Sequence, residues 1–89
     1  MYYITAVRMS GDTEDHITSV RWLNAASGIS KTSSVASMAA WLGKGNRAYV
    51  GGQGGRAEVL VVGPSGRVPY LRSQANGQWT DNLRRLPRY

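Results

Sequence analysis

The chain has 89 residues, which suits a single domain over residues 1–89 with one modest hydrophobic core. It contains no cysteine and no apolar run long enough to span a bilayer, which excludes disulfides, thiolate chemistry and a transmembrane helix. The first residues lack the basic and apolar regions of a signal peptide, so we expect a cytoplasmic protein without membrane contact. Eleven Lys and Arg against five Asp and Glu give a net charge of +6.

Arginine supplies nine of the eleven basic residues. Its planar guanidinium matches phosphate oxygens and also stacks on aromatic rings or bases, which a lysine does less well. The composition therefore favours a nucleotide or nucleic-acid partner, with a basic surface that has no specific partner as the alternative.

Residues 2–10 and 16–24 alternate between apolar and polar side chains and are rich in Val, Ile, Thr, Tyr and Trp, which predicts two strands of a hairpin. The motif Ile-Thr-x-Val-Arg occurs in both, at residues 4–8 and 17–21. Strict alternation predicts a core-facing set of Thr5, Val7, Met9, Thr18, Val20 and Trp22. The opposite face would then present Arg8 and Arg21 together.

Residues 27–34 are predicted as a loop, and residues 33–45 as a helix. Ser33 or Ser34 would cap the helix N-terminus, and Gly43 would end it in the left-handed conformation. Residues at helical spacing form one apolar stripe: Val35, Met38, Ala39 and Leu42.

Three further strands are predicted at residues 47–50, 56–62 and 68–73, separated by the glycine-rich turns GGQGG and GPSG. The middle one is apolar on both faces, which indicates a central strand whose outer face is covered by the C-terminal segment or by a second copy of the chain. Asn76-Gly77 predicts another turn, and Thr80 can cap one helical turn. The expected fold is α+β, with a mostly antiparallel five-stranded sheet, one helix and the order β-β-α-β-β-β.

Two motifs carry a resemblance to a known family. HITxVxW at residues 16–22 and NGxxTDNLxxLP at residues 76–87 resemble the small bacterial and phage domain of unknown function 3892. Members usually have Asp-Gly where this chain has Asn76-Gly77, which forms an equivalent turn. The resemblance covers essentially the whole chain and implies one compact domain, with no established activity.

No catalytic constellation is found. His16 is the only histidine, no GxSxG motif is present, and GGQGGR lacks the ending of a P-loop. The acidic turn GDTEDH does not match a calcium-binding loop. We therefore expect no enzyme activity, no catalytic residue, no metal site and no cofactor.

The candidate ligand-binding residues are those that could combine to hold a nucleotide. Arginines would contact phosphate, aromatic rings would stack on the base, and Asp81 or Asn82 would contact its polar edge. The phosphate-binding candidates are Arg8, Arg21, Arg56 and Arg72, and the stacking candidates are Tyr49 and Trp79. Trp79 could equally cap the core. Trp22 is expected in the core, and Trp41 at its edge or in an oligomer contact.

Three functions remain open on the sequence alone. The first is non-enzymatic binding of a phosphate-bearing ligand, most of all a nucleotide or nucleotide-derived signal, as in a phage counter-defence protein that sequesters such a signal. The second is sequence-tolerant nucleic-acid binding, which predicts steep salt dependence. The third is a protein-interaction module, with a homo-oligomer as one form.

Overall fold

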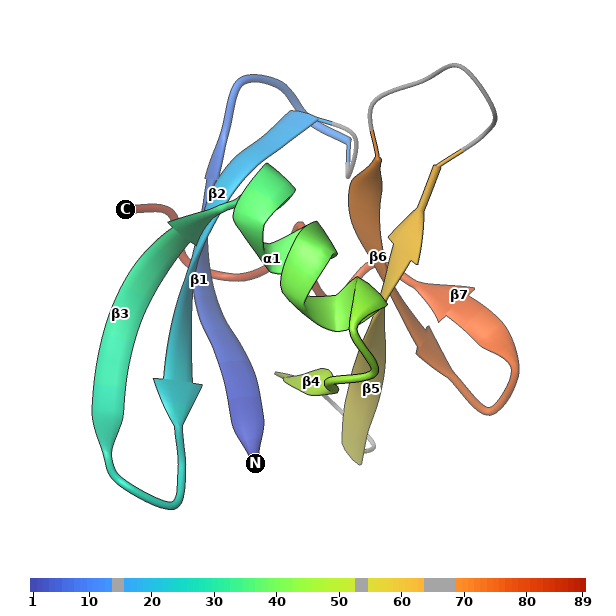
Figure 1. The fold of residues 1–89 in the computed structure, drawn as a ribbon. Helices are drawn as coiled ribbons and strands as arrows, with labels where there is room; N and C mark the ends of the chain where they lie inside the picture. The colour runs from blue at the N-terminus through green and yellow to red at the C-terminus, as the bar shows by residue number, and fades with distance from the viewer. Residues whose placement is uncertain (14–15, 53–54, 64–68) are drawn as a thin grey trace.

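The computed structural model describes residues 1–13, 16–52, 55–63 and 69–89. It contains one helix and seven strands in these residues (Figure 1). The elements in chain order are β1 (Tyr2–Met9), β2 (Ile17–Asn24), β3 (Ile29–Ser34), α1 (Val35–Gly43), β4 (Ala48–Gly52), β5 (Gly55–Val62), β6 (Tyr70–Ala75) and β7 (Gln78–Thr80). The turn glycines and prolines predicted at 53–54 and 64–66, and Val68 as the start of a strand, lie outside the described residues.

The strands form one mixed sheet in the order β3-β2-β1-β4-β5-β6-β7. All neighbouring pairs are antiparallel except β1 and β4, which run parallel at Tyr2–Ala48 and Tyr3–Tyr49. The α+β class with a single helix is confirmed. The predicted number of five strands and the order β-β-α-β-β-β are wrong, because the sheet has seven strands and the order β-β-β-α-β-β-β-β. The expected predominance of antiparallel pairs is confirmed, with β1–β4 as the parallel exception.

Two strands escaped prediction for physical reasons. The segment predicted as a loop forms β3 at the edge of the sheet, where its residues are exposed except for half-buried Ser33, so no apolar alternation marks it. β7 has only three residues and depends on the Asn76-Gly77 turn. Both turn residues have positive φ, 53° and 77°, which is the conformation that a two-residue hairpin of this type requires.

The repeated motif is explained by two β-bulges. Ile4 pairs with Trp22 and the next pair is Ala6–Arg21, so Thr5 is the extra residue on β1; on β2 the extra residue is Thr18. Each threonine hydroxyl donates a hydrogen bond to the arginine carbonyl of the other strand, Thr5 to Arg21 at 3.3 Å and Thr18 to Arg8 at 3.0 Å. The two bulges are related by an approximate two-fold axis through the Val7–Val20 pair at the centre of the hairpin.

The bulges change which side chains face the core. An extra residue shifts the alternation by one position, so the Ile and Val of each repeat, three residues apart, both point inward. Ile4, Val7, Ile17 and Val20 are buried, whereas Thr5 and Thr18 are exposed. The prediction that both threonines face the core is therefore wrong. The prediction that Arg8 and Arg21 share the outer face is confirmed. Arg21 pairs with Ala6, which lies two residues before Arg8 on β1, so the two arginine side chains point to the same side of the hairpin.

Helix α1 packs against β2, β3, β5 and β6 on one side of the sheet (Figure 1). Its predicted apolar stripe is confirmed, with Val35 and Met38 buried and Ala39 and Leu42 packed against the core. Ser34 caps the N-terminus by accepting a hydrogen bond from the Ser37 N–H at 3.1 Å. The predicted stop at Gly43 is wrong, because Gly43 is the last helical residue and the positive φ of 95° falls on Gly45.

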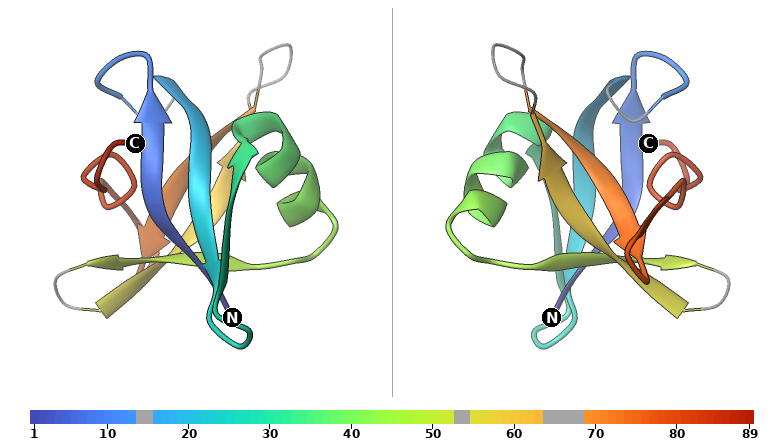
Figure 2. Two further views of the ribbon diagram at one scale, coloured as in Figure 1. Left: turned by 90° about the vertical axis from the view of Figure 1, so that its left-hand side faces the viewer. Right: turned by 90° about the vertical axis from the view of Figure 1, so that its right-hand side faces the viewer.

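The C-terminal segment lies on the side of the molecule opposite the helix (Figure 2). Leu83 is fully buried in the same core as the helix residues. Backbone hydrogen bonds join the Val7 N–H to the Pro87 carbonyl at 3.0 Å and the Tyr89 N–H to the Val7 carbonyl at 3.3 Å. This segment therefore pairs with the part of β1 that β4 leaves free. That it covers the outer face of the strand at residues 56–62 stays a prediction.

Candidate functional site

The structure divides the eight candidate residues into three arginine–aromatic contacts and one acidic turn. The first contact involves Arg8 and Arg21, whose guanidinium carbons each lie 4.8 Å from the ring centroid of Tyr89. Arg8 Nε also donates to the Tyr89 carbonyl at 3.1 Å, and the Tyr89 hydroxyl lies 2.6 Å from Ser19 Oγ. The two arginines of the repeat are thus engaged by the chain itself.

The second contact is on the outer face of β4 and β5, where the Arg56 guanidinium lies 4.3 Å from the Tyr49 ring centroid. Tyr49 also lies beside Tyr3 of β1, with 6.3 Å between the ring centroids. Arg56 is exposed and Tyr49 half-buried, and Arg56 Nη1 also donates a hydrogen bond to Met1 Sδ at 2.8 Å. This arrangement presents a positive charge already placed on an aromatic surface.

The third contact is on β6 and β7, where the Arg72 guanidinium lies 4.7 Å from the Trp79 ring centroid. The Trp79 side chain is 47% exposed, so it does not cap the core. Buried Arg72 Nε has no hydrogen-bond acceptor among the described residues. Stacking on Trp79 is therefore the contact that fixes the Arg72 side chain in the described part of the chain.

Asp81 and Asn82 form hydrogen bonds within their own turn. Asp81 accepts a hydrogen bond from Arg85 Nε at 2.7 Å and lies 3.6 Å from Arg84. The hydrogen bond from Arg85 and its charge lower the pKa of Asp81 below its ordinary value. The Asn82 N–H donates to Thr80 Oγ1 at 3.5 Å, which is the contact predicted for Thr80 as the cap of this turn. The Asp81 carboxylate, for its part, is already paired with two arginines.

Strand register joins the second and third contacts in one row across the outer face. Residues directly opposite one another on neighbouring strands share a face, and the pairings connect, in order, Tyr3, Tyr49, Glu58, Gln74 and Trp79. At about 4.8 Å per strand, Tyr49 and Trp79 lie roughly 14 Å apart. We call this row, with Arg56 and Arg72, the outer aromatic row.

The structure does not bring Arg8 and Arg21 to the outer aromatic row. They lie toward the other end of β1, beside Tyr89, whereas the row crosses β1 at Tyr3. The residue in the middle of the row is Glu58, which is not among the candidate residues predicted from the sequence. Its carboxylate lies 3.9 Å from Arg47 Nε, with both side chains partly exposed, so an arginine offsets its negative charge.

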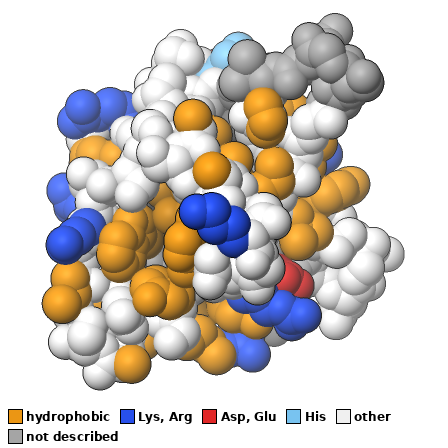
Figure 3. Space-filling model, in the orientation of Figure 1, with side chains coloured by type: hydrophobic (Ala, Val, Ile, Leu, Met, Phe, Trp, Pro, Cys, Tyr) orange, Lys and Arg blue, Asp and Glu red, His pale blue; other side chains and the backbone are white. Residues whose placement is uncertain are grey.

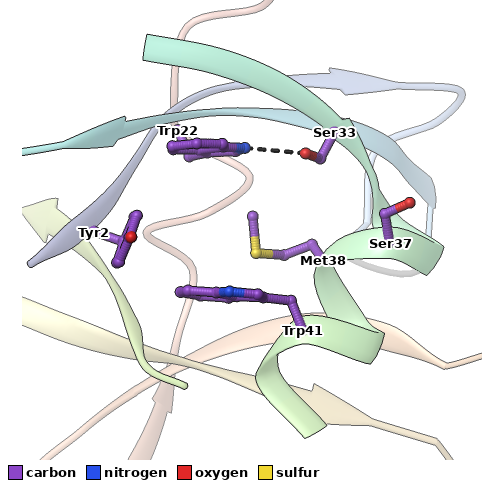
Figure 4. Close-up of a pocket in the computed structure, with 6 residues that line it drawn as sticks. All are labelled: Tyr2, Trp22, Ser33, Ser37, Met38 and Trp41. Atoms are coloured by element: carbon purple, nitrogen blue, oxygen red, sulfur yellow. Dashed lines mark hydrogen bonds between the residues drawn. The ribbon is translucent and has the colours of Figure 1, made fainter. Parts of the chain in front are cut away.

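A pocket of about 290 Å³ lies on the helix side, away from all eight candidate residues. It is lined by Tyr2, Trp22, Ser33, Ser37, Met38 and Trp41 (Figure 4). In the space-filling view of this side, apolar side chains are visible between scattered basic ones (Figure 3). Sequence reasoning placed Trp22 in the core and Trp41 at its edge or in an oligomer contact. Periodicity shows which face of a strand or helix a residue occupies, but not whether the side chains opposite it fill the space between them.

The fold and these surfaces define a small α+β protein with one strongly twisted mixed sheet and a basic, arginine-bearing outer face. A family model described as "Protein of unknown function (DUF3892)" matches residues 3–87. The chain therefore belongs to the DUF3892 family, as its two motifs indicated. Neither the curated proteins nor the solved structures contain a match. In the described part of the chain, no helix is long and apolar enough to cross a membrane.

Proposed function

We propose that this protein binds a phosphate-bearing ligand that also carries bases, without chemical turnover, on the outer aromatic row. The observation that carries the proposal is the repeated unit of an arginine stacked on an aromatic ring, Arg56 on Tyr49 and Arg72 on Trp79. Proteins that bind single-stranded nucleic acid combine positive charge along the backbone with aromatic rings on which bases stack. A sheet face bearing such rings can hold two or three bases at once.

The spacing of the two units favours a short strand of nucleotides over one mononucleotide. Tyr49 and Trp79 are separated by three strand intervals, roughly 14 Å, and lie on an open sheet face. One base can stack on only one of them. A linear ligand that contacts both rings brings its phosphates near Arg56 and Arg72, and the net charge of +6 attracts it.

The proposed role is binding rather than catalysis. His16 is exposed, and its Nδ1 lies 3.3 Å from Thr13 Oγ1 within the β1–β2 turn. The His16 carbonyl also accepts hydrogen bonds from the Ser10 N–H at 2.8 Å and from the Ser10 hydroxyl at 3.3 Å. These contacts support a structural role for His16 in closing the hairpin.

Fluorescence anisotropy with labelled single-stranded DNA and RNA of about ten nucleotides tests the proposal. Trp79→Ala should weaken binding by about 1–3 kcal/mol, because one base loses its stacking surface. Arg72→Ala should weaken binding and reduce the slope of log K against log salt by about 0.7, the value for one phosphate contact on a single strand. Lys44→Ala is the matched control, because it removes one exposed positive charge beside the helix.

The outcomes separate the alternatives. Equal, small losses in Arg72→Ala, Trp79→Ala and Lys44→Ala would show non-specific attraction to a basic protein and refute the proposed site. Tight binding of ATP or a cyclic dinucleotide, with much weaker binding of oligonucleotides, would show that the ligand is a single signal nucleotide and not a nucleic-acid strand. It would support a protein that sequesters such a signal. Binding of none of these ligands would leave a protein-interaction role.

A further inference from the structure

We infer that the pocket between α1 and β1–β3 is a second, independent ligand site that takes a small, flat heteroaromatic ring, uncharged or anionic, with hydrogen-bond acceptors. We call it the tryptophan slot. Figure 4 shows the indoles of Trp22 and Trp41 on opposite sides of the pocket, with Tyr2 beside both and the end of Met38 between them. Nothing in the proposed nucleic-acid site depends on it, since the two sites lie on opposite faces of the sheet.

Ring geometry makes the pocket a slot with aromatic walls. The Tyr2 centroid lies 5.7 Å from Trp22 and 4.8 Å from Trp41, with interplanar angles of 67° and 75°. Tyr2 therefore stands edge-on to both indoles and closes one end of the space between them. A flat ring that enters this space can stack, offset, on an indole, which is one of the arrangements that aromatic rings favour.

Size and floor fit a small ring system. The volume of about 290 Å³ lies at the lower end of the range for small-molecule sites. Met38 is 5% exposed and rises from the floor, with its thioether end between the two indoles. A ring that enters there displaces this end, which an unbranched side chain allows by a change of rotamer. The slot therefore suits one ring or a fused pair of rings.

One serine hydroxyl supplies a donor at the rim: Figure 4 shows that of Ser33 facing the slot and that of Ser37 directed away from it. Ser33 Oγ accepts a hydrogen bond from Trp22 Nε1 at 3.0 Å, and Ser37 Oγ accepts one from the Ser34 hydroxyl at 3.1 Å. No acceptor for either serine's own proton is found among the described residues. The Ser33 hydroxyl can therefore donate to a ligand, so the ligand should carry ring nitrogens, carbonyls or a carboxylate.

The charge of the surrounding residues distinguishes this slot from an aromatic cage that binds ammonium groups. Such cages also use several aromatic walls, but the residues that line this pocket include no Asp or Glu. Lys31 pairs directly with Trp22 across β2 and β3, so the two side chains share a face. With this lysine and a net charge of +6, a cation would be disfavoured and an anionic group at the rim favoured.

Titrations followed by the indole N–H signals in NMR spectra test the inference directly. The chain has three tryptophans, and the Trp79 signal on the other face reports separately on the outer aromatic row. The probes are adenosine, nicotinate, 1-methylnicotinamide and tetramethylammonium, at high salt and without phosphate. We expect adenosine or nicotinate to move the Trp22 and Trp41 signals, with roughly millimolar dissociation constants for ligands of this size.

Two variants check the geometry. Trp41→Ala removes one wall while keeping a good helix former in α1, and should abolish the shift of Trp22. Ser33→Ala should weaken binding about three- to tenfold, the effect of one neutral hydrogen bond. Trp79→Ala removes the tryptophan of the outer aromatic row, so shifts of Trp22 and Trp41 that persist in this variant arise from the slot itself.

Either of two results would overturn the inference. If neither adenosine nor nicotinate moves the Trp22 and Trp41 signals at millimolar concentration, the slot is not a ligand site. If tetramethylammonium or 1-methylnicotinamide binds better than nicotinate, the site is a cation cage. Failure of oligonucleotide binding would leave this result untouched, because the probes carry no phosphate.

Discussion

Tyr89 should stabilise the β1–β2 hairpin by stacking between the two arginines of the repeated motif. Its ring centroid lies 4.8 Å from the guanidinium carbon of Arg8 and the same distance from that of Arg21. Its hydroxyl lies 2.6 Å from Ser19 Oγ, close to the central pair of the hairpin. The perturbation to make is Tyr89→Ala, with Tyr89→Phe as the variant that keeps the ring.

The contacts give the expected magnitude. Each exposed cation–π contact contributes about 0.5–1 kcal/mol, and the hydroxyl hydrogen bond contributes about 0.5–1.5 kcal/mol. Tyr89→Ala should therefore lower the free energy of unfolding by about 2–3 kcal/mol, and Tyr89→Phe by about 1 kcal/mol. For a chain of this length, 1 kcal/mol corresponds to a Tm change of about 4–8 °C.

Urea unfolding of the single and double variants provides the assay. A double-mutant cycle between Tyr89→Ala and Arg21→Ala should give a coupling energy of about 0.5–1 kcal/mol. Arg8→Ala should cost more than Arg21→Ala, because Arg8 Nε also donates to the Tyr89 carbonyl. If the effects of Tyr89→Ala add to those of both arginine variants without coupling, the stacking explanation of the motif is refuted.

The structure makes four further predictions. Because Arg21 is engaged by Tyr89, Arg21→Ala should reduce oligonucleotide affinity less than Arg72→Ala in the same anisotropy assay; the reverse order would place the ligand on the hairpin. Leu83→Ala should lower the free energy of unfolding by about 2–5 kcal/mol, because a fully buried side chain leaves a cavity; a loss below 1 kcal/mol in urea unfolding would contradict its core position. The pKa of Asp81 is lowered in the folded state, so its ionised carboxylate stabilises the fold at a pH above its ordinary pKa of 3.8, and this stability is lost as the pH falls through the folded-state pKa. Asp81→Asn should therefore make the Tm fall less at acidic pH. An unchanged pH profile of the Tm would count against the Arg85 contact. Gly77→Ala should lower the Tm, because φ is 77° there and a side chain is strained in that conformation by about 1–2 kcal/mol; an unchanged Tm would argue against this turn.

Local signals in the sequence determined much of the fold. The helix and its cap at Ser34 followed from serine chemistry and 3.6-residue spacing, because both depend on residues close in the chain. The turn at Asn76-Gly77 followed from the need for positive φ. The pairing of the two motif strands, and the placing of Arg8 and Arg21 on one face, needed only the hairpin between them.

Long-range contacts decided the rest. β3 carries no apolar alternation because it lies at a solvent-exposed edge, and its pairing with β2 could not be inferred from composition. The inward direction of both Ile4 and Val7 required a bulge, which breaks the regular alternation on which the prediction depended. Pairing of β1 with β4 across the helix connection then set which strands share the outer aromatic row.

The candidate site shows the same division between local and distant information. Composition identified arginine and aromatic residues as the surface chemistry, and the structure stacks Arg56 on Tyr49 and Arg72 on Trp79. Which arginine meets which ring depends on strand register, and the partner of Arg8 and Arg21 proved to be Tyr89, far away in the chain. Sequence alone determined the side chains available and the local turns that carry them, whereas the tertiary structure decided which of them meet, because those contacts join strands that no local signal relates.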